Sequence, residues 1–410
     1  MVLNYIWIGF FIAAFISCIF QAVVKDNSGI FAQVVQATFD MAGLSVEIAL
    51  GLVGVLCLWL GFFTIAQRAG FVELLTKAFR PLFKQLMPEV PSDHPAIGSV
   101  TMNMAANMLG LDNAATPLGL KAMQDLQELN PHKETASNAQ ILFLVLNTSS
   151  VTILPVTIFL FRAQQGSLDP TAVFIPILLA TCASTLAGLL MVAFIQRLSL
   201  FNKTIFFYVL GLTVLIGLLL SFLLSGTADS LADKSSLLGN LLLLLIIISF
   251  LCMGFFRKIN VYDAFIDGAK QGFDVALKII PYLVAMLVAI GMLRASLVLD
   301  AVLAGVEKIV VALGLNPDFI AALPTALMRP FSGSGARAMM LETMNTYGVD
   351  SFAANVAAIV QGSTETTFYV LAVYFGSVGI KRVRHAIGCG LFADFVGITA
   401  AIFVGYWFFS

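Results

Sequence analysis

Charged residues are scarce in this chain. Only 11% of its 410 residues are Asp, Glu, Lys or Arg, whereas a soluble domain typically carries roughly a quarter. Hydrophobic residues make up 60% of the sequence, and the mean hydropathy is +0.97. The net charge of −1 leaves no basic surface of the kind that binds nucleic acid. These values exclude an ordinary soluble domain, and we expect an all-α polytopic membrane protein.

Residues that support metal, redox or nucleophilic chemistry are also few. The five cysteines stand singly in apolar runs, and the three histidines (His94, His132 and His385) lie in predicted loops. Neither set has the spacing of metal ligands, a disulfide framework or a catalytic triad. No phosphate-binding GxxxxGK[ST] motif occurs. We therefore expect neither an enzyme nor a resident metal or cofactor. Energy for transport would have to come from an ion gradient or from a partner protein.

Long apolar runs fill most of the sequence, and about 20 apolar residues span a bilayer as a helix. The first run has no basic residue before it and no small-residue cleavage site, so we expect a retained helix rather than a signal peptide. Two regions, 97–126 and 320–345, are apolar but interrupted by Gly, Pro, Asn and Ser, which is typical of broken or re-entrant helices. With them, the sequence predicts 9 to 11 membrane segments. The other spans are expected near 4–24, 38–66, 139–162, 172–196, 204–224, 237–256, 272–293, 352–377 and 386–409.

The second part of the chain repeats the order of features in the first. A Phe-Asp-x-Ala motif begins at Phe39 and again at Phe273, and each copy opens a long apolar run. In both parts an amphipathic stretch follows, then an interrupted region, then a run that contains a polar cluster, then one more apolar run. We therefore predict a duplication, with a first repeat at 1–199 and a second at 200–410.

The distribution of Lys and Arg predicts that the two repeats have opposite orientations, because these residues favour cytoplasmic loops. An acidic loop, 225–235, is then expected outside. The charges of all these loops agree with one orientation, in which the N-terminus is cytoplasmic and the C-terminus is external. The loop after Phe161 then lies outside, while its counterpart near Lys381 lies inside, as in inverted repeats. The basic clusters lie at 68–84, 197–203, 257–258 and 381–384.

Polar side chains interrupt both halves at matching positions. They are costly in lipid unless they line a cavity or face protein, so we predict a solute site between the repeats near the membrane midplane. Asp112, Glu365 and Arg329 are predicted to couple an ion or to act as a gate, because ionisable residues inside membranes are usually functional. The predicted solute-binding residues are Asn113, Thr116, Asn147, Ser150, Ser332, Ser334, Arg337, Gln361, Thr364 and Glu365.

The two arginines of the second half have two interpretations. Arg329 and Arg337 bracket a Gly-rich break, where their guanidinium groups could hold a carboxylate or phosphate bidentately. Equally, they could neutralise Glu342 and Glu365 inside the protein. The sequence leaves both interpretations open.

The amides and hydroxyls of the first half have a structural alternative as well. Asn103 and Asn107 are four residues apart and share a helix face. They either line the site or form interhelical hydrogen bonds, worth ~0.6 kcal/mol on average in membranes. The hydroxyls at 148–152 could simply bond to carbonyl groups and bend a helix. Asp394, in the last predicted span, is interpreted as the partner of a basic group.

These motifs carry a family resemblance over almost the whole chain. The run Asn103–Met123 resembles spore maturation protein A, and the runs Arg329–Ala338 and Gln361–Tyr369 resemble spore maturation protein B. The chain is similar to a fusion of the two, joined near 197–204. Both families belong to the nucleoside recognition or gate domain group, which is similar to parts of concentrative nucleoside transporters and of the ferrous-iron transporter membrane domain.

The resemblance implies a membrane transporter or gate. Concentrative nucleoside transporters contact nucleoside through a Gln-Thr-Glu-Ala-Pro element. Gln361, Thr364 and Glu365 are similar to it in residue type, but they are spaced differently and no proline follows.

Three functions are consistent with the sequence. We expect a secondary transporter or exporter of a small, polar, anionic organic solute in a bacterial inner membrane, with Na⁺ or H⁺ as the coupling ion. One alternative is a membrane scaffold or regulatory gate for a partner complex, and another is a nucleoside transporter. The expected partners are the solute, the lipid bilayer and further copies of the chain in a homo-oligomer, with no nucleic acid.

Overall fold

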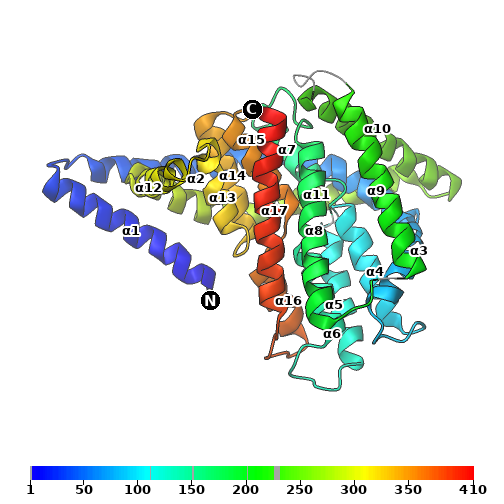
Figure 1. Ribbon diagram of the computed structural model, residues 1–410. Helices are drawn as coiled ribbons and strands as arrows, with labels where there is room; N and C mark the ends of the chain where they lie inside the picture. The colour runs from blue at the N-terminus through cyan, green and yellow to red at the C-terminus, as the bar shows by residue number, and fades with distance from the viewer. Residues whose placement is uncertain (1, 111, 150–151, 201, 226–230) are drawn as a thin grey trace.

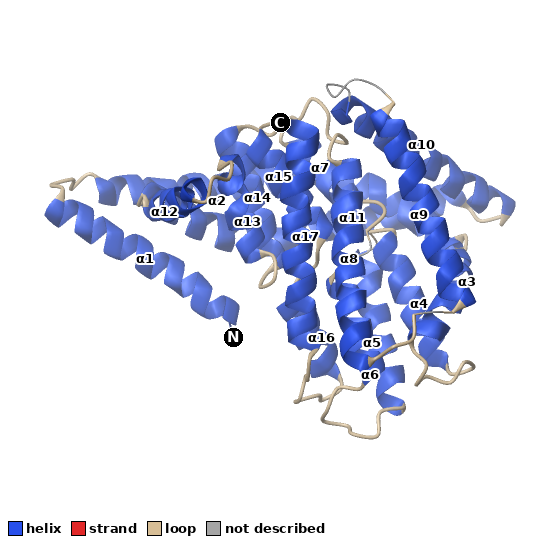
Figure 2. Cartoon of the chain, in the orientation of Figure 1, coloured by secondary structure: helices blue, strands red, loops and turns tan. Residues whose placement is uncertain are grey.

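The computed structural model describes residues 2–110, 112–149, 152–200, 202–225 and 231–410. Within these ranges the chain is helical, and the β-type pairing is limited to one isolated bridge between Thr135 and Arg382 (Figure 2). The prediction of an all-α polytopic membrane protein is confirmed. Eight segments of the described chain are long and apolar enough to cross a membrane. They are α1 (Val2–Val24), α2 (Ile30–Arg68), α8 (Phe174–Gln196), α9 (Lys203–Leu224), α10 (Leu231–Phe256), α11 (Val261–Ala295), α15 (Phe352–Ser363) together with α16 (Thr367–Ser377), and α17 (Ala386–Phe409).

Two of the predicted continuous spans are broken, and this corrects the sequence-based boundaries. The run 139–162 divides into α6 (Asn138–Thr148) and α7 (Val156–Gln164), and the run 352–377 divides into α15 and α16. Each break falls at the polar cluster of its run. In the first, Pro155 immediately precedes α7, where its missing N–H is no loss. Apolar composition alone could not locate these breaks, because both sides of each are equally hydrophobic.

The remaining helices lie in the same order in both halves. The amphipathic stretches form α3 (Phe71–Leu86) and α12 (Val298–Ala312). The interrupted regions form pairs of shorter helices instead of spans. In the first half these are α4 (Pro95–Met108) and α5 (Asp112–Glu128), and in the second the short η2 (Asp318–Ala322) and α13 (Leu323–Met328) precede α14 (Gly333–Tyr347). This order is what a duplication predicts, although the duplication and its inversion stay predictions.

The two halves are joined along two helix pairs. The long helices α2 and α11 run antiparallel, because Gly291 faces Met41 while Phe265 faces Gly61. A Cβ atom on Gly272 would lie 2.6 Å from the backbone of Cys57, so this crossing requires glycine. The second pair is α8 with α17, which stand side by side in Figure 1, whereas α1 projects away from the body of the protein.

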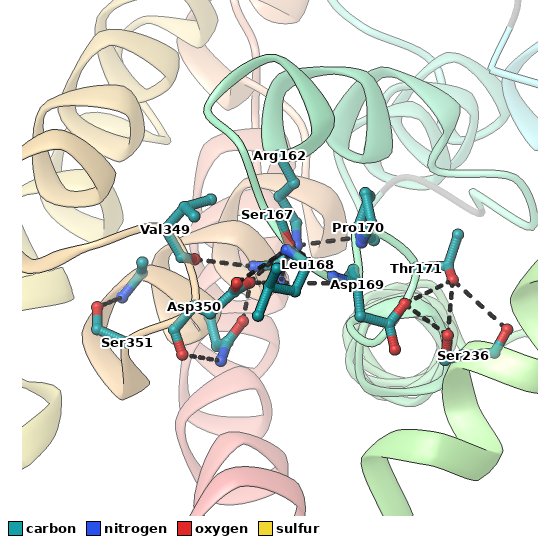
Figure 3. A network of polar contacts seen from close by, with 12 residues as sticks. Arg162, Ser167, Leu168, Asp169, Pro170, Thr171, Ser236, Val349, Asp350 and Ser351 are labelled. Atoms are coloured by element: carbon teal, nitrogen blue, oxygen red, sulfur yellow. Dashed lines mark hydrogen bonds and ion pairs between the residues drawn. The ribbon is translucent and has the colours of Figure 1, made fainter.

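A polar clasp joins the halves at the end of α7. Arg162 is 1% exposed, and its guanidinium donates to Asn355 Oδ1 at 2.6 Å and to the Val349 carbonyl at 3.3 Å, and forms an ion pair with Asp350 at 3.0 Å (Figure 3). The Asp350 carboxylate also accepts hydrogen bonds from Ser167 Oγ and the Leu168 N–H. This Arg162 clasp therefore ties the loop after the first broken span to the loop before the second.

A reciprocal clasp joins the loop after the second broken span to the loop before the first. Lys381 Nζ lies 2.6 Å from Glu134 Oε1, and Arg384 donates to the Ala136 carbonyl at 3.0 Å. Hydrogen bonding to Lys381 lowers the pKa of Glu134. Ser137 then caps α6 in a capping box with Gln140, so the clasp fixes where that helix begins.

Candidate functional site

A cavity of about 610 Å³ lies where the breaks of the two halves meet. The first half contributes residues of α4, α5, α6 and α7, and the second contributes residues of α11, α14, α15 and α16. The polar segments that the sequence singled out therefore converge on one space. Of the residues predicted for the site, this cavity is lined by Thr116, Asn147, Arg329, Ser332, Ser334, Arg337, Gln361 and Glu365.

The other predicted residues have different positions. Thr364 is fully buried but does not line the cavity, and its methyl group instead faces Gly397 on α17. Asp112 and Asn113 begin α5, one turn before the cavity-lining Thr116, but the structure does not describe their side chains. Ser150 lies outside the described residues.

Four helices begin at the cavity, two from each half. Ala115 of the first turn of α5, and Pro155 and Thr157 at the start of α7, line it on one side. On the other side, α14 begins beside it at Gly333, and α16 follows Thr366, which also lines it. The first N–H groups of a helix have no partner within the helix, and the helix dipole makes this end positive. The walls therefore favour an anion.

Among the residues whose side chains the structure describes, three charged ones line the cavity, and together they add one positive charge. Arg329 and Arg337 contribute two positive charges and Glu365 one negative charge. Arg329 is buried, donates to the Thr364 carbonyl and forms an ion pair with Glu365 at 3.4 Å, so it acts as the internal counter-ion that the sequence left as an alternative. Arg337 lies 5.2 Å from the ring centre of Phe161, over its face.

The amides of the first half form a connected chain. Asn103 donates to the Ala115 carbonyl at 2.7 Å, and Asn107 donates to Asn147 Oδ1 at 2.8 Å. Asn103 is fully buried and holds α4 against α5, which is the structural interpretation. Asn107 and Asn147 line the cavity, so their amides also present polar atoms to it. In the second half, the Oε1 atom of the cavity-lining Gln361 is buried without a hydrogen-bond partner in the described residues.

The backbone at each break is bonded to the rest of the protein. The Glu365 N–H donates to the Thr148 carbonyl at 2.7 Å, which links the two breaks directly. The Phe368 N–H donates to the Pro330 carbonyl at 3.0 Å, and the Ile153 N–H donates to the Met108 carbonyl at 3.0 Å. Irregular backbone at membrane depth requires such partners or water.

Aromatic residues of the cavity were missed in the sequence. Tyr282, Tyr369 and Tyr374 line it, and Phe331 stacks on Phe368 with ring centres 5.2 Å apart. One signal was available for α16, since Thr366, Val370 and Tyr374 recur every four residues and share a helix face. No local pattern marks Tyr282, because α11 is apolar along most of its length.

The cavity falls within the part of the chain that known proteins share. Residues 49–165 and 276–381 match the family model described as nucleoside recognition gate, and every cavity-lining residue lies in these two ranges. The chain is 42% identical over 160 residues to spore maturation protein B of Bacillus subtilis (strain 168), covering 39% of this chain and 88% of that protein. It is 35% identical over 187 residues to spore maturation protein A of the same organism, covering 46% of this chain and 92% of that protein.

These matches confirm the resemblance to both spore maturation proteins. The division into repeats at 1–199 and 200–410 stays a prediction. Two matched ranges, one in each half, enclose one polar cavity between broken helices of a multi-pass membrane protein. The chain belongs to the nucleoside recognition gate family.

Proposed function

We propose that the chain is a secondary transporter of a small anionic organic solute and that the central cavity is its binding site. The observation that carries this proposal is the set of four helix N-termini at one cavity, where the described charged side chains sum to +1. Pairs of half-helices that point their N-termini at an anionic group are a recurrent feature of transporters with broken helices.

The size and chemistry of the cavity suit a metabolite. Ligand pockets usually enclose ~300–1,000 Å³, and this cavity holds about 610 Å³. Thr116 and Ser334 offer hydroxyl groups from opposite halves, and Asn147 and Gln361 offer amides in the same way. Arg337 and Arg329 both line the cavity, and their guanidinium groups are the donors that an anionic group would meet there.

A second candidate is a nucleoside or nucleotide. The family description names nucleoside recognition, and Tyr369, Tyr374 and the stacked Phe331 give the cavity aromatic faces on which a base could lie. A phosphorylated or otherwise anionic ligand suits the two cavity-lining arginines and the helix N-termini better than an uncharged nucleoside does. The convergence of all four polar segments on one cavity favours transport over a scaffold, in which each segment would pair separately with a neighbouring helix.

The proposal also states in which membrane the chain lies and how it is oriented there. We place the chain in a bacterial inner membrane with a cytoplasmic N-terminus, following the basic loops. Assembly into a homo-oligomer is a further prediction from the sequence.

The test begins with metabolite profiling of cells that contain or lack the protein, followed by uptake of each candidate into proteoliposomes. Arg337→Gln should reduce uptake about 10- to 150-fold, because a charge-assisted hydrogen bond contributes about 1.5–3 kcal/mol. Arg68→Gln is the matched control, since Arg68 forms an exposed pair with Asp267 away from the cavity and should leave uptake unchanged. Normal uptake by a folded Arg337→Gln protein would refute the site. Equal uptake of an anion and its neutral analogue would refute the anionic class.

A further inference from the structure

The last helix presents a single acidic residue to both breaks. Gly390, Asp394 and Gly397 are spaced i, i+4 and i+7 on α17, so they share one helix face. Asp394 is 1% exposed. Basic partners were expected for it from the sequence, but none of the ion pairs in the described ranges involves Asp394. Arg329 acts on Asp394 electrostatically without forming an ion pair, so the expected basic partner is present but is shared with Glu365.

Threonine side chains from both breaks pack against this face. Thr367 Oγ1 donates to Asp394 Oδ2 at 2.5 Å. Thr148, at the end of α6, approaches Gly390, with its methyl group 3.5 Å from where a Cβ would lie. Thr364, which follows α15, approaches Gly397 to 2.5 Å in the same sense. The two glycines therefore let both breaks come close to the carboxylate.

Three oxygen atoms at this place have no hydrogen-bond partner in the described residues. They are Asp394 Oδ1, Thr148 Oγ1 and Thr364 Oγ1. The three residues are each no more than 1% exposed. Buried polar atoms are nearly always paired, so two unpaired threonine hydroxyls together with an unpaired oxygen of the carboxylate itself point to a bound partner. Hard oxygen atoms of this kind suit a hard cation.

The helix ends also favour a positive ion here. Thr148 and Thr364 lie at the C-terminal ends of α6 and α15, where the helix dipole is negative. The cavity, by contrast, lies at the N-terminal ends of the partner helices α7 and α16. Arg329 and Glu365 neutralise each other, so Asp394 leaves this region with one unbalanced negative charge, which a monovalent cation balances.

We propose that Asp394, Thr367, Thr148 and Thr364 form a Na⁺ site that couples the ion gradient to the solute cavity. The inference deepens the proposed transport function and rests on it for its purpose. The predicted coupling residues Asp112, Glu365 and Arg329 are replaced in this role by Asp394. A Na⁺ ion binds through oxygen lone pairs and can contact the carboxylate and both hydroxyls at once, which is why we assign the site to Na⁺. Binding at the C-terminal ends of α6 and α15 would hold both breaks in the shape that completes the cavity on their other side.

The experiment measures ²²Na⁺ binding to the purified full-length protein in lipid nanodiscs, without any solute. Choline replaces Na⁺ to keep the ionic strength constant, and binding is repeated from pH 6 to pH 8. The unmodified protein should show saturable binding, and Asp394→Asn should weaken it at least tenfold. Thr367→Val removes the hydroxyl without changing the side-chain shape and should also weaken binding. Asp40→Asn, on the exposed part of α2, should bind as the unmodified protein does.

Absence of saturable ²²Na⁺ binding to the unmodified protein would overturn the proposal, as would unchanged binding to a folded Asp394→Asn or Thr367→Val protein. Solute uptake that depends on a proton gradient and is indifferent to Na⁺ would overturn it too, while leaving the transport function intact. Saturable Na⁺ binding with no solute transported would instead refute the transport function alone.

Discussion

Replacing Arg162 with methionine tests whether the Arg162 clasp holds the two halves together. Methionine retains much of the side-chain volume but removes every donor. The Asn355 amide oxygen and the Val349 carbonyl would lose their guanidinium partner, and Asp350 would lose its ion pair. Asn355 is buried, so its oxygen would have no ready substitute.

The magnitude follows from how buried each partner is. Removing one partner of a buried ion pair costs about 3–5 kcal/mol. Asp350 is 40% exposed and can regain water, which places Arg162→Met near the lower limit, at about 3 kcal/mol. Arg162→Lys keeps the charge but cannot donate to the separate acceptors at once. Its unfolding free energy should therefore lie between those of the unmodified protein and Arg162→Met.

Thermal unfolding in detergent, followed by the fraction of protein that remains monodisperse, measures the effect. Arg68→Met is the matched control, because its ion pair with Asp267 is exposed at both ends and should contribute about 0–1 kcal/mol. Equal stability of the Arg162→Met and Arg68→Met proteins would refute the reasoning. A loss in Arg162→Met that Asp350→Ala reproduces in full would assign the effect to the ion pair alone.

Two further predictions concern the packing of α17 and the second clasp. Gly397→Ala would place a Cβ 2.5 Å from the Thr364 methyl group, and we expect a loss of about 1–3 kcal/mol in unfolding free energy, whereas Gly388→Ala, with open space around it, should be neutral. Because the pKa of Glu134 is lowered by Lys381, this pair stabilises the fold above the unfolded pKa of Glu134 and ceases to do so as the pH falls through the lowered value. Unfolding curves of the unmodified and Glu134→Gln proteins should therefore differ at pH 7 and converge as the pH falls through the lowered pKa of Glu134, and a difference that stays constant with pH would contradict this assignment.

The sequence predicted the elements of the site better than their arrangement. Polar clusters inside apolar runs marked the breaks near Asn147 and Gln361, because such residues are costly in lipid wherever they lie. Alignment of the two halves then predicted that these clusters meet at one site between them. Thr364 lies off the cavity because helical periodicity stops at a break. Its side chain follows the extended backbone between α15 and α16 and faces α17, while Glu365 beside it faces the cavity.

Long-range partners could not be found from the sequence. Arg162 lies at the end of an apolar run, and its partners Asp350 and Asn355 are 188 and 193 residues away. Nothing local distinguishes it from an arginine at a membrane surface. Asp394 shows the same limit, because only the packing of both breaks on α17 brings it into a hydrogen bond with Thr367 and into electrostatic interaction with Arg329.

The hydrogen bond from the Glu365 N–H to the Thr148 carbonyl has a mechanical consequence. It couples the two breaks, since separating them would leave one donor and one acceptor unpaired. Each unpaired buried group costs about 1–3 kcal/mol. Thr148 is fully buried and is not among the residues that line the cavity, so water in the cavity does not replace this bond. A movement of one break therefore carries the other with it, and the broken spans of the two halves act as one mechanical unit.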